Sequence, residues 1–329
     1  TAAYWTSCNN IRSEMFSKIN EFFDNLKKIH YICKKKIIIM KKNFIKKYAI
    51  TRMLRYASHQ SDENIIRMID IANKYFIKSE KVRWNAEKIR RIFVEHQPGA
   101  QLAKNTFSRI SKQSLDCVIQ NFFINAAVIG SQRQEQLRKE LNIWLPWFFV
   151  ISPTARCNLT CVGCYAGNYS KQEDLSFELA DRIFNEAKDL GIYFVTVSGG
   201  EPFMWPHLLD IMEKHHDMFF QIYTNGTLIT KDVANRLGKL GNAAPAISIE
   251  GFEKETDARR GEGTFKRIME AMDNLRNAGV LFGFSATPTK LNIETLMSDE
   301  FIDLMIEKGC SIGWFFQYVP IGRKPDVSL

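Results

Sequence analysis

The spacing of apolar residues changes near residue 147. Before it, apolar residues recur three and four positions apart, a spacing that is typical of amphipathic helices. One stripe contains Ile65, Ile69, Ala72 and Phe76, and another contains Leu115, Val118, Ile119, Phe122 and Ala126. Pro98-Gly99 interrupts this pattern. Trp144 and Trp147 mark its end, and we expect both side chains to pack against other residues of the protein. We therefore predict a small α-helical domain over residues 48–146.

After residue 147, short apolar runs alternate with helical stripes at intervals of roughly 25 to 35 residues, the rhythm of a parallel sheet covered by helices. The predicted strands are 147–153, 192–198, 219–224, 246–249, 281–287 and 312–319. The predicted helices are 176–190, 207–217, 230–240, 264–278 and 298–308, the fourth with Thr264 as its N-cap. The expected fold class is α/β, with a partial (β/α)6 TIM-like barrel over 147–329 preceded by the helical domain.

Six apolar strand residues are expected to line this barrel, or to be ordinary core residues, and both interpretations can hold: Val195, Val197, Ile222, Ile247, Ile249 and Phe284. The sequence ends directly after the sixth predicted strand, which predicts a chain truncated before its last helix and any C-terminal extension. In a parallel array the loops at the carboxyl ends of the strands carry the site. The polar motifs of this half follow such strand ends, which predicts a single site.

Charge divides the chain in the same place. Residues 1–146 hold 27 Lys and Arg against 12 Asp and Glu, whereas residues 147–329 hold 18 against 24. We expect residues 1–47 to be a basic segment outside the native fold, with Met40 as the true start. The alternative is an interfacial helix over Lys34 to Lys47 that contacts a membrane surface. A solvated helical face explains the basic charge better than nucleic-acid binding does.

The chain has seven cysteines, an odd number, which indicates a reducing compartment rather than a set of disulfides. The sequence shows no signal peptide and no apolar run of 18 residues, so we predict a cytoplasmic protein. Three of them, Cys157, Cys161 and Cys164, form a C-x3-C-x2-C motif after the first predicted strand. Cys8, Cys33, Cys117 and Cys310 are scattered, as expected of small apolar residues.

A closed zinc site would need a fourth ligand, yet there is no His between His96 and His207, and the next Cys is Cys310. Three thiols on one loop favour an iron–sulfur cluster with one free iron.

A second motif, Ser198-Gly199-Gly200-Glu201-Pro202, follows the second predicted strand. The two glycines allow close approach to the backbone, and the carboxylate beside them can accept hydrogen bonds from an ammonium group. Asn225-Gly226 follows the third predicted strand, and we expect it to form a turn at the same end of the sheet.

Together, the cysteine motif and the Gly-Gly-Glu-Pro motif resemble the radical S-adenosylmethionine (SAM) superfamily, in particular its SPASM-type and molybdenum-cofactor-cyclase-like members. The resemblance spans about residues 147–320. It implies a [4Fe–4S] cluster on Cys157, Cys161 and Cys164, with SAM bound to the open iron. It also implies an anaerobic oxidoreductase chemistry in which SAM is cleaved reductively and the 5′-deoxyadenosyl radical takes a hydrogen from the substrate.

The same resemblance implies further SAM contacts. Gly199, Gly200, Glu201 and Pro202 would hold the methionine amino group, with Glu201 accepting its hydrogen bonds. Ser248 and Glu250 would bind the ribose, and Arg260 rather than Arg259 would bind the SAM carboxylate. Ser285, Thr287 and the backbone around Val319 are additional expected neighbours.

One position departs from the superfamily pattern, which commonly has an aromatic residue just before the third cysteine. This chain has Gly163 there, and Tyr165 on the far side could partly substitute as an adenine contact. The expected partners are a low-potential electron donor of flavodoxin or ferredoxin type and a substrate that is a ribosomal peptide, a lipid acyl chain or a small metabolite such as a tetrapyrrole. The basic first unit favours lipid. The alternative function is a non-catalytic zinc- or Fe–S-binding protein whose basic domain binds nucleic acid or a membrane surface.

Overall fold

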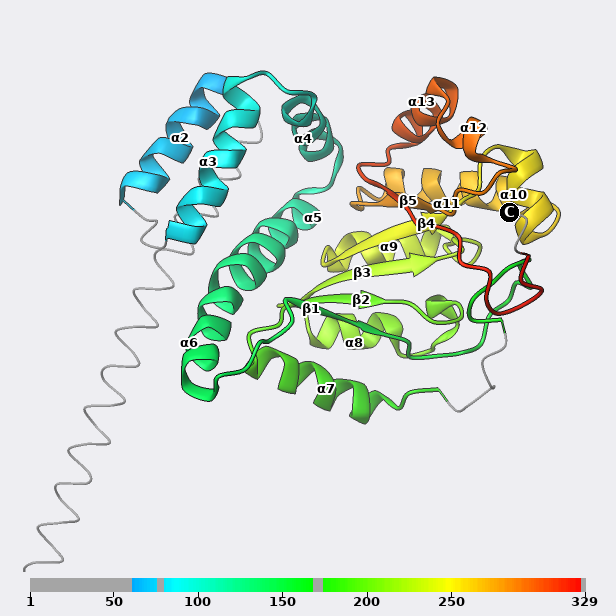
Figure 1. Cartoon of the computed structure of the whole chain (residues 1–329), viewed down its shortest axis with the longest axis horizontal. Coiled ribbons are helices and arrows are strands. Elements are labelled where there is room, and N and C mark those ends of the chain that lie inside the picture. Colours follow the sequence, from blue (N-terminus) through cyan, green and yellow to red (C-terminus); the bar gives the residue numbers. More distant parts are fainter. Residues whose placement is uncertain (1–60, 76–79, 168–173, 327–329) are drawn as a thin grey trace, which may run out of the picture. The chain divides into compact units, whose positions relative to one another are not determined.

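The computed structural model describes residues 61–75, 80–167 and 174–326 (Figure 1). The expected basic segment 1–47, the proposed start at Met40 and the membrane-contacting helix lie outside these residues. No helix in the described part is long and apolar enough to cross a membrane.

The first described elements are helical. They are α2 (Asp62–Tyr75), α3 (Glu80–Val94), α4 (Pro98–Arg109), α5 (Lys112–Cys117), the π-helix η1 (Val118–Gly130) and α6 (Ser131–Leu141). Pro98 begins α4 at the position where proline costs no hydrogen bond. Ser111 caps α5 by accepting a hydrogen bond from the backbone of Ser114. The helices match the prediction from apolar spacing, while their independence as a domain remains a prediction.

The second half is a six-stranded parallel sheet in the order β1-β2-β3-β4-β5-β6. Its strands are β1 (Phe148–Ile151), β2 (Phe194–Val197), β3 (Phe219–Thr224), β4 (Ala243–Ser248), β5 (Gly283–Ala286) and β6 (Gly313–Phe315). The helices are α7 (Phe177–Asp189), α8 (Leu208–Lys214), α9 (Lys231–Leu240), α10 (Glu253–Arg260), α11 (Thr264–Asn277), α12 (Ile293–Leu296) and α13 (Asp299–Lys308), with the short 3-10 helix η2 (Pro202–Met204). The sheet curls into a half-barrel, which confirms the predicted fold class.

All six predicted strands and five predicted helices are present, with β4 starting earlier and β6 ending sooner than expected. The prediction missed α10, whose sequence has no apolar stripe. The prediction that Thr264 caps α11 is wrong, because Gly263 occupies the cap position with φ 72°. Asp257 accepts hydrogen bonds from the backbone N–H groups of Gly263 and Phe265 at 2.7 and 2.8 Å and satisfies this helix start instead.

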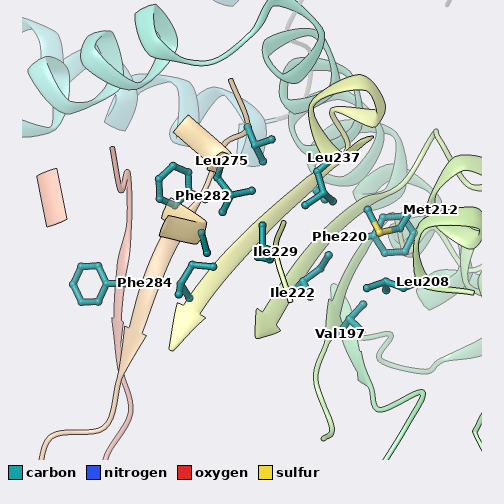
Figure 2. Close-up of a cluster of buried hydrophobic side chains, with 14 of the residues drawn as sticks. Val197, Leu208, Met212, Phe220, Ile222, Ile229, Leu237, Leu275, Phe282 and Phe284 are labelled. Atoms are coloured by element: carbon teal, nitrogen blue, oxygen red, sulfur yellow. The ribbon is translucent and has the colours of Figure 1, made fainter. Parts of the chain in front are cut away.

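The main hydrophobic core lies between the sheet and its helices (Figure 2). Val197 and Ile222 lie on the side of the sheet that carries buried residues of α8 and α9 such as Leu208, Met212 and Leu237. The ring of Phe284 meets that of Phe301 in α13 at a centroid distance of 5.6 Å. The prediction that six apolar strand residues are core residues is confirmed, whereas the prediction that they line the barrel is wrong, because they pack into this core: Val195, Val197, Ile222, Ile247, Ile249 and Phe284.

Since side chains alternate along a strand, the concave face carries the other set. From β2 to β5 this set includes the polar residues Thr196, Gln221, Tyr223, Ser248 and Ser285.

Helix η1 packs against the amino ends of the strands. The ring of Phe122 contacts Phe194 and Phe219, the first residues of β2 and β3, at centroid distances of 5.4 and 5.8 Å. Trp147 packs on Phe122 as expected, at 5.5 Å, whereas Trp144 is 84% exposed and its expected packing role is wrong. The amide of Asn121 donates to the carbonyls of His216 and Met218. This end of the sheet is therefore closed, and the carboxyl ends of the strands carry the site.

Candidate functional site

The cysteine loop, residues 157–167, leaves the sheet after β1. Cys157 is exposed, while Cys161 and Cys164 are half-buried. The backbone N–H of Leu159 and the side-chain amide of Asn225 both point toward the sulfur of Cys157, at 3.5 and 3.8 Å. Desolvation raises the pKa of the Cys161 thiol and also that of the Cys157 thiol, although Cys157 as a whole residue is exposed. The Cys157 sulfur therefore lies in a partly desolvated place with two amide donors beside it.

The described residues contain no group of three or more His, Cys, Asp or Glu side chains arranged to hold a single metal ion. The donor set offered by the loop is three thiols, and the sequence has no fourth Cys and no His close to them. Three thiols fit three corners of a [4Fe–4S] cluster with one iron left open, whereas a closed zinc site takes four ligands.

The Gly199-Gly200 turn lies against the backbone that leads into the cysteine loop. The N–H of Gly200 donates to the carbonyl of Thr154 at 2.9 Å, and the N–H of Glu201 donates to that of Arg156 at 2.7 Å. A Cβ on Gly199 would lie 2.6 Å from the Thr154 oxygen, and one on Gly200 would lie 2.1 Å from the Arg156 oxygen. Glycine is therefore required at both positions by the chain itself, because its backbone occupies the space that a side chain would need.

Glu201 is fully buried and joins the ends of β2 and β3. Its Oε1 accepts hydrogen bonds from the Thr224 hydroxyl at 2.7 Å and the Phe203 N–H at 3.1 Å, and its Oε2 accepts one from the Asn225 N–H at 2.8 Å. Burial raises the pKa of Glu201, and the three hydrogen bonds oppose this rise. Pro202, also buried, starts η2 directly after it. Groups of the protein itself therefore occupy most of the hydrogen-bond acceptor sites of the Glu201 carboxylate.

Glu250, which is 1% exposed, pairs with two arginines at the end of β4. Arg260 approaches its Oε1 with Nη2 at 2.5 Å, and Arg259 Nη1 lies 2.8 Å from its Oε2. The backbone N–H of Thr287, after β5, also donates to Oε2, at 3.2 Å. Glu250 is thus the centre of a buried charge cluster that joins β4, α10 and the end of β5.

Helix α10 also holds the middle of the cysteine loop. The N–H of Val162 donates to the carbonyl of Arg259 at 2.9 Å, and Arg259 Nε donates back to the carbonyl of Val162 at 3.2 Å. The positive charge of Arg260 lies close enough to act on the Cys161 thiol, whose pKa it lowers against the effect of burial. The arginines therefore connect the Glu250 cluster to the cysteines.

One tyrosine lies within the cysteine loop and another packs against it from the segment after β6. The hydroxyl of Tyr165 lies 3.0 Å from that of Ser198 at the end of β2. The ring of Tyr318, from the segment after β6, packs beside Gly163. Ser248 and Ser285, paired across β4 and β5 and sharing the concave face, lie 3.2 Å apart at their hydroxyls.

The profile of the radical SAM superfamily matches residues 151–305. Residues 151–305 form a radical SAM domain. The chain is 33% identical to the mycofactocin maturase MftC of Mycolicibacterium smegmatis over 53% of this chain and 45% of that protein. It is 32% identical to the AdoMet-dependent heme synthase of Methanosarcina barkeri over 52% of this chain and 50% of that protein. The chain therefore spans about half the length of the curated relatives that it matches.

A solved structure supports the same comparison. Streptococcus suis SuiB bound to S-adenosylmethionine superposes with a TM-score of 0.51 at 25% identity, over 59% of this chain and 46% of that chain. SuiB has also been solved with its precursor peptide SuiA, and that structure superposes with a TM-score of 0.50.

Within the radical SAM domain, all the site residues predicted from the sequence except Arg260 lie at a strand's carboxyl end or in the segment that follows it. The cysteines and Tyr165 follow β1, Gly199 to Pro202 follow β2, and Ser248 and Glu250 end and follow β4. Arg260 ends α10 and turns back to Glu250. The ligand roles of these residues remain predictions.

Sequence reasoning missed the partners of the two buried carboxylates. No sequence pattern indicates Thr224, and Asn225 is predicted only as part of a turn. The backbone N–H of Asn225 donates to Glu201, and its side-chain amide donates to Asn158 at 2.8 Å. The contacts of both residues with Glu201 follow from the position of β3 beside β2, since neighbouring parallel strands bring their ends together. The sequence predicts a site role for Arg260 rather than Arg259, yet both contact Glu250.

Proposed function

We propose that this chain is the catalytic part of a radical SAM enzyme, with Cys157, Cys161 and Cys164 holding a [4Fe–4S] cluster. The observation that carries the proposal is the position of the cysteine loop. The Gly199–Glu201 turn is hydrogen-bonded to the backbone that leads into the loop, and Arg259 is hydrogen-bonded to the middle of the loop. When bound, the cluster supplies one electron to S-adenosylmethionine, giving methionine and a 5′-deoxyadenosyl radical that takes a hydrogen atom from the substrate.

The residues around the loop would bind and orient S-adenosylmethionine. The Gly199-Gly200-Glu201 backbone would hold the methionine amino group, with Pro202 fixing the chain beyond. Because the Glu201 carboxylate already accepts three hydrogen bonds, we assign it mainly to fixing this backbone and leave one lone pair for the ligand.

Ser248 would face the ribose from the concave side of β4. Arg260, held by Glu250, would face the carboxylate, and Tyr165 would border the methionine end. Glu250 itself is assigned to holding the arginines, because three groups of the chain already occupy it.

For the substrate we propose a peptide. The concave face of β2 to β5 offers hydroxyl and amide groups from Thr196, Gln221, Tyr223, Ser248 and Ser285, and no Lys or Arg lies within these strands. Such a surface suits the hydrogen-bonding groups of a peptide better than an acyl chain, or a tetrapyrrole whose carboxylates need cations. SuiB, which binds a precursor peptide, supports this choice. Delivery of the electron by a flavodoxin or ferredoxin remains a prediction.

The test is anaerobic reconstitution of the full chain with iron and sulfide, followed by dithionite and S-adenosylmethionine. We expect 5′-deoxyadenosine from the wild type and none from Cys157→Ala, Cys161→Ala or Cys164→Ala. Cys310→Ala is the matched control, because Cys310 is buried in the core of the sheet and should leave the product unchanged. A wild type that takes up zinc, or that holds iron and yields no 5′-deoxyadenosine, would contradict the proposal.

A further inference from the structure

The segment after β6 is built onto the second half of the cysteine loop. We name residues 318–326 the C-terminal strap. The N–H of Gly163 donates to the carbonyl of Arg323 at 2.9 Å, and the N–H of Arg323 donates to the carbonyl of Cys164 at 3.0 Å. The Arg323 side chain adds a bond from Nη2 to the carbonyl of Gly167 at 3.3 Å. These bonds fix the backbone on both sides of the third cysteine.

Glycines on both partners make this contact close. A Cβ on Gly322 would lie 2.2 Å from the carbonyl oxygen of Cys164, and a Cβ on Gly167 would lie 2.5 Å from the Cβ of Arg323. Neither glycine can be replaced without moving backbone. The strap and the loop that bears the cysteines therefore pack tightly against each other, backbone against backbone.

Tyr318 occupies the space beside Gly163, which has a φ of +66°. A Cβ on Gly163 would lie 3.0 Å from Cε2 of the Tyr318 ring and 3.1 Å from its hydroxyl oxygen. That hydroxyl accepts a hydrogen bond from the N–H of Asp326 at 3.1 Å, so the strap holds the ring by its far end. The ring is thus half-buried and fixed beside the residue that precedes Cys164.

We propose that Tyr318 is an S-adenosylmethionine-positioning residue, whose ring forms an aromatic wall for adenine where Gly163 supplies no side chain. This inference rests on the proposed function. With its methionine end at the Gly199–Glu201 turn after β2, the ligand would extend across the strand ends toward β5 and β6. Tyr165 belongs to the methionine end, because its hydroxyl meets Ser198 after β2. Tyr318 comes from the β6 side, where its ring would offer a flat face on which the purine can stack.

The test compares Tyr318→Leu with Tyr318→Phe in the reconstituted full chain. Leu fills the space beside Gly163 without an aromatic face, whereas Phe keeps the ring. Binding of S-adenosylmethionine is measured by equilibrium dialysis, and binding of methionine, which lacks adenine, by the EPR spectrum of the reduced cluster. Phe316→Leu is the matched control, because that ring packs on Tyr223 at 5.4 Å.

For Tyr318→Leu we expect S-adenosylmethionine to bind about tenfold more weakly, because leucine offers the base no aromatic face on which to stack. Iron content and methionine binding should equal those of the wild type. Tyr318→Phe and Phe316→Leu should bind S-adenosylmethionine within about twofold of the wild type.

Unchanged S-adenosylmethionine binding in Tyr318→Leu would overturn the inference. An equal weakening of methionine, or a loss of iron, would also overturn it, since the ring would then serve the loop rather than adenine. A wild type that binds no S-adenosylmethionine would instead refute the proposed function.

Discussion

The carboxylate of Glu201 accepts a 2.7 Å hydrogen bond from the hydroxyl of Thr224, and both residues are buried. This bond joins the Gly-Gly turn after β2 to the end of β3. Glu201 also receives the N–H groups of Phe203 and Asn225, one on each oxygen. The turn that would hold the methionine amino group is therefore tied to the neighbouring strand by one side chain.

We expect Glu201→Gln to destabilise the domain by about 2 kcal/mol, because an amide places an NH₂ group against a buried donor. The free energy of unfolding from urea titrations of the protein without cluster measures this. Thr224→Ser keeps the hydroxyl and should cost about 1 kcal/mol for the lost methyl group. Equal stability of Glu201→Gln and the wild type would show that the carboxylate is not needed for this junction.

Gly200→Ala should disrupt the site, because the new Cβ would lie 2.1 Å from the carbonyl oxygen of Arg156. We expect a loss of about 3 kcal/mol in the free energy of unfolding and a lower iron content after reconstitution, since the backbone leading to Cys157 must move. Iron per chain and urea unfolding measure the two effects.

Gly99→Ala is its control. Gly99 lies in the first turn of α4, and a Cβ there would meet only Ile92 Cγ2, at 3.4 Å, within 4 Å. Alanine reduces the freedom of the unfolded chain, so we expect a gain of up to about 1 kcal/mol. If both variants lost stability equally, close approach at Gly200 would not be the cause.

The order of the strands and of the longer helices could be predicted from the sequence because each of them has its own apolar period, which α10 lacks. The sequence does not indicate which side chains of each strand face the helices and which face the concave side. In Phe194-Val-Thr-Val197 the valines point to the helices and Thr196 to the concave face, the reverse of the predicted lining. Apolar residues mark a buried face, but in a barrel wall both faces are covered.

The site, too, could be predicted only in part from the sequence. The cysteine spacing and the Gly-Gly pair are local in sequence, so they were recognised. The partners of Glu201 and Glu250 come from β3, α10 and the end of β5, and only the fold brings them together. The Tyr318 contact with Gly163 joins residues far apart in the chain, and no local pattern indicates it.

Glu250→Gln should be strongly destabilising, because it leaves Arg260, with a 13% exposed side chain, without its counter-charge. Breaking a buried pair from one side typically costs about 3 to 5 kcal/mol. We expect a loss at the lower end, since Arg259 and Arg260 both keep some access to water. Urea unfolding measures this.

Glu262→Gln removes the same charge from an exposed residue two positions after Arg260 and should change stability by less than about 0.5 kcal/mol. Similar losses in both variants would mean that net charge, and not the buried cluster, decides the outcome.

His215 should make the stability of the domain depend on pH. The imidazole is buried at the end of α8, its Nε2 lies 2.9 Å from Asp181, and its ring packs edge-on against Phe184. Burial lowers the pKa of His215, and nearby Lys188 lowers it further, against the opposing effects of Asp181 and Asp217. The fold therefore favours the neutral ring.

Because the folded pKa lies below the unfolded value of about 6.5, the unfolded chain binds more protons in the interval between the two. Stability is thus fully present above about pH 6.5 and falls as the pH drops through the folded pKa. We expect the melting temperature of the wild type to decrease from pH 7.5 to pH 5.5, and His215→Gln to show a flatter profile over the same range. His216→Gln, at the next and more exposed position, should retain the wild-type slope. A wild-type slope in His215→Gln would assign the acid sensitivity to other groups.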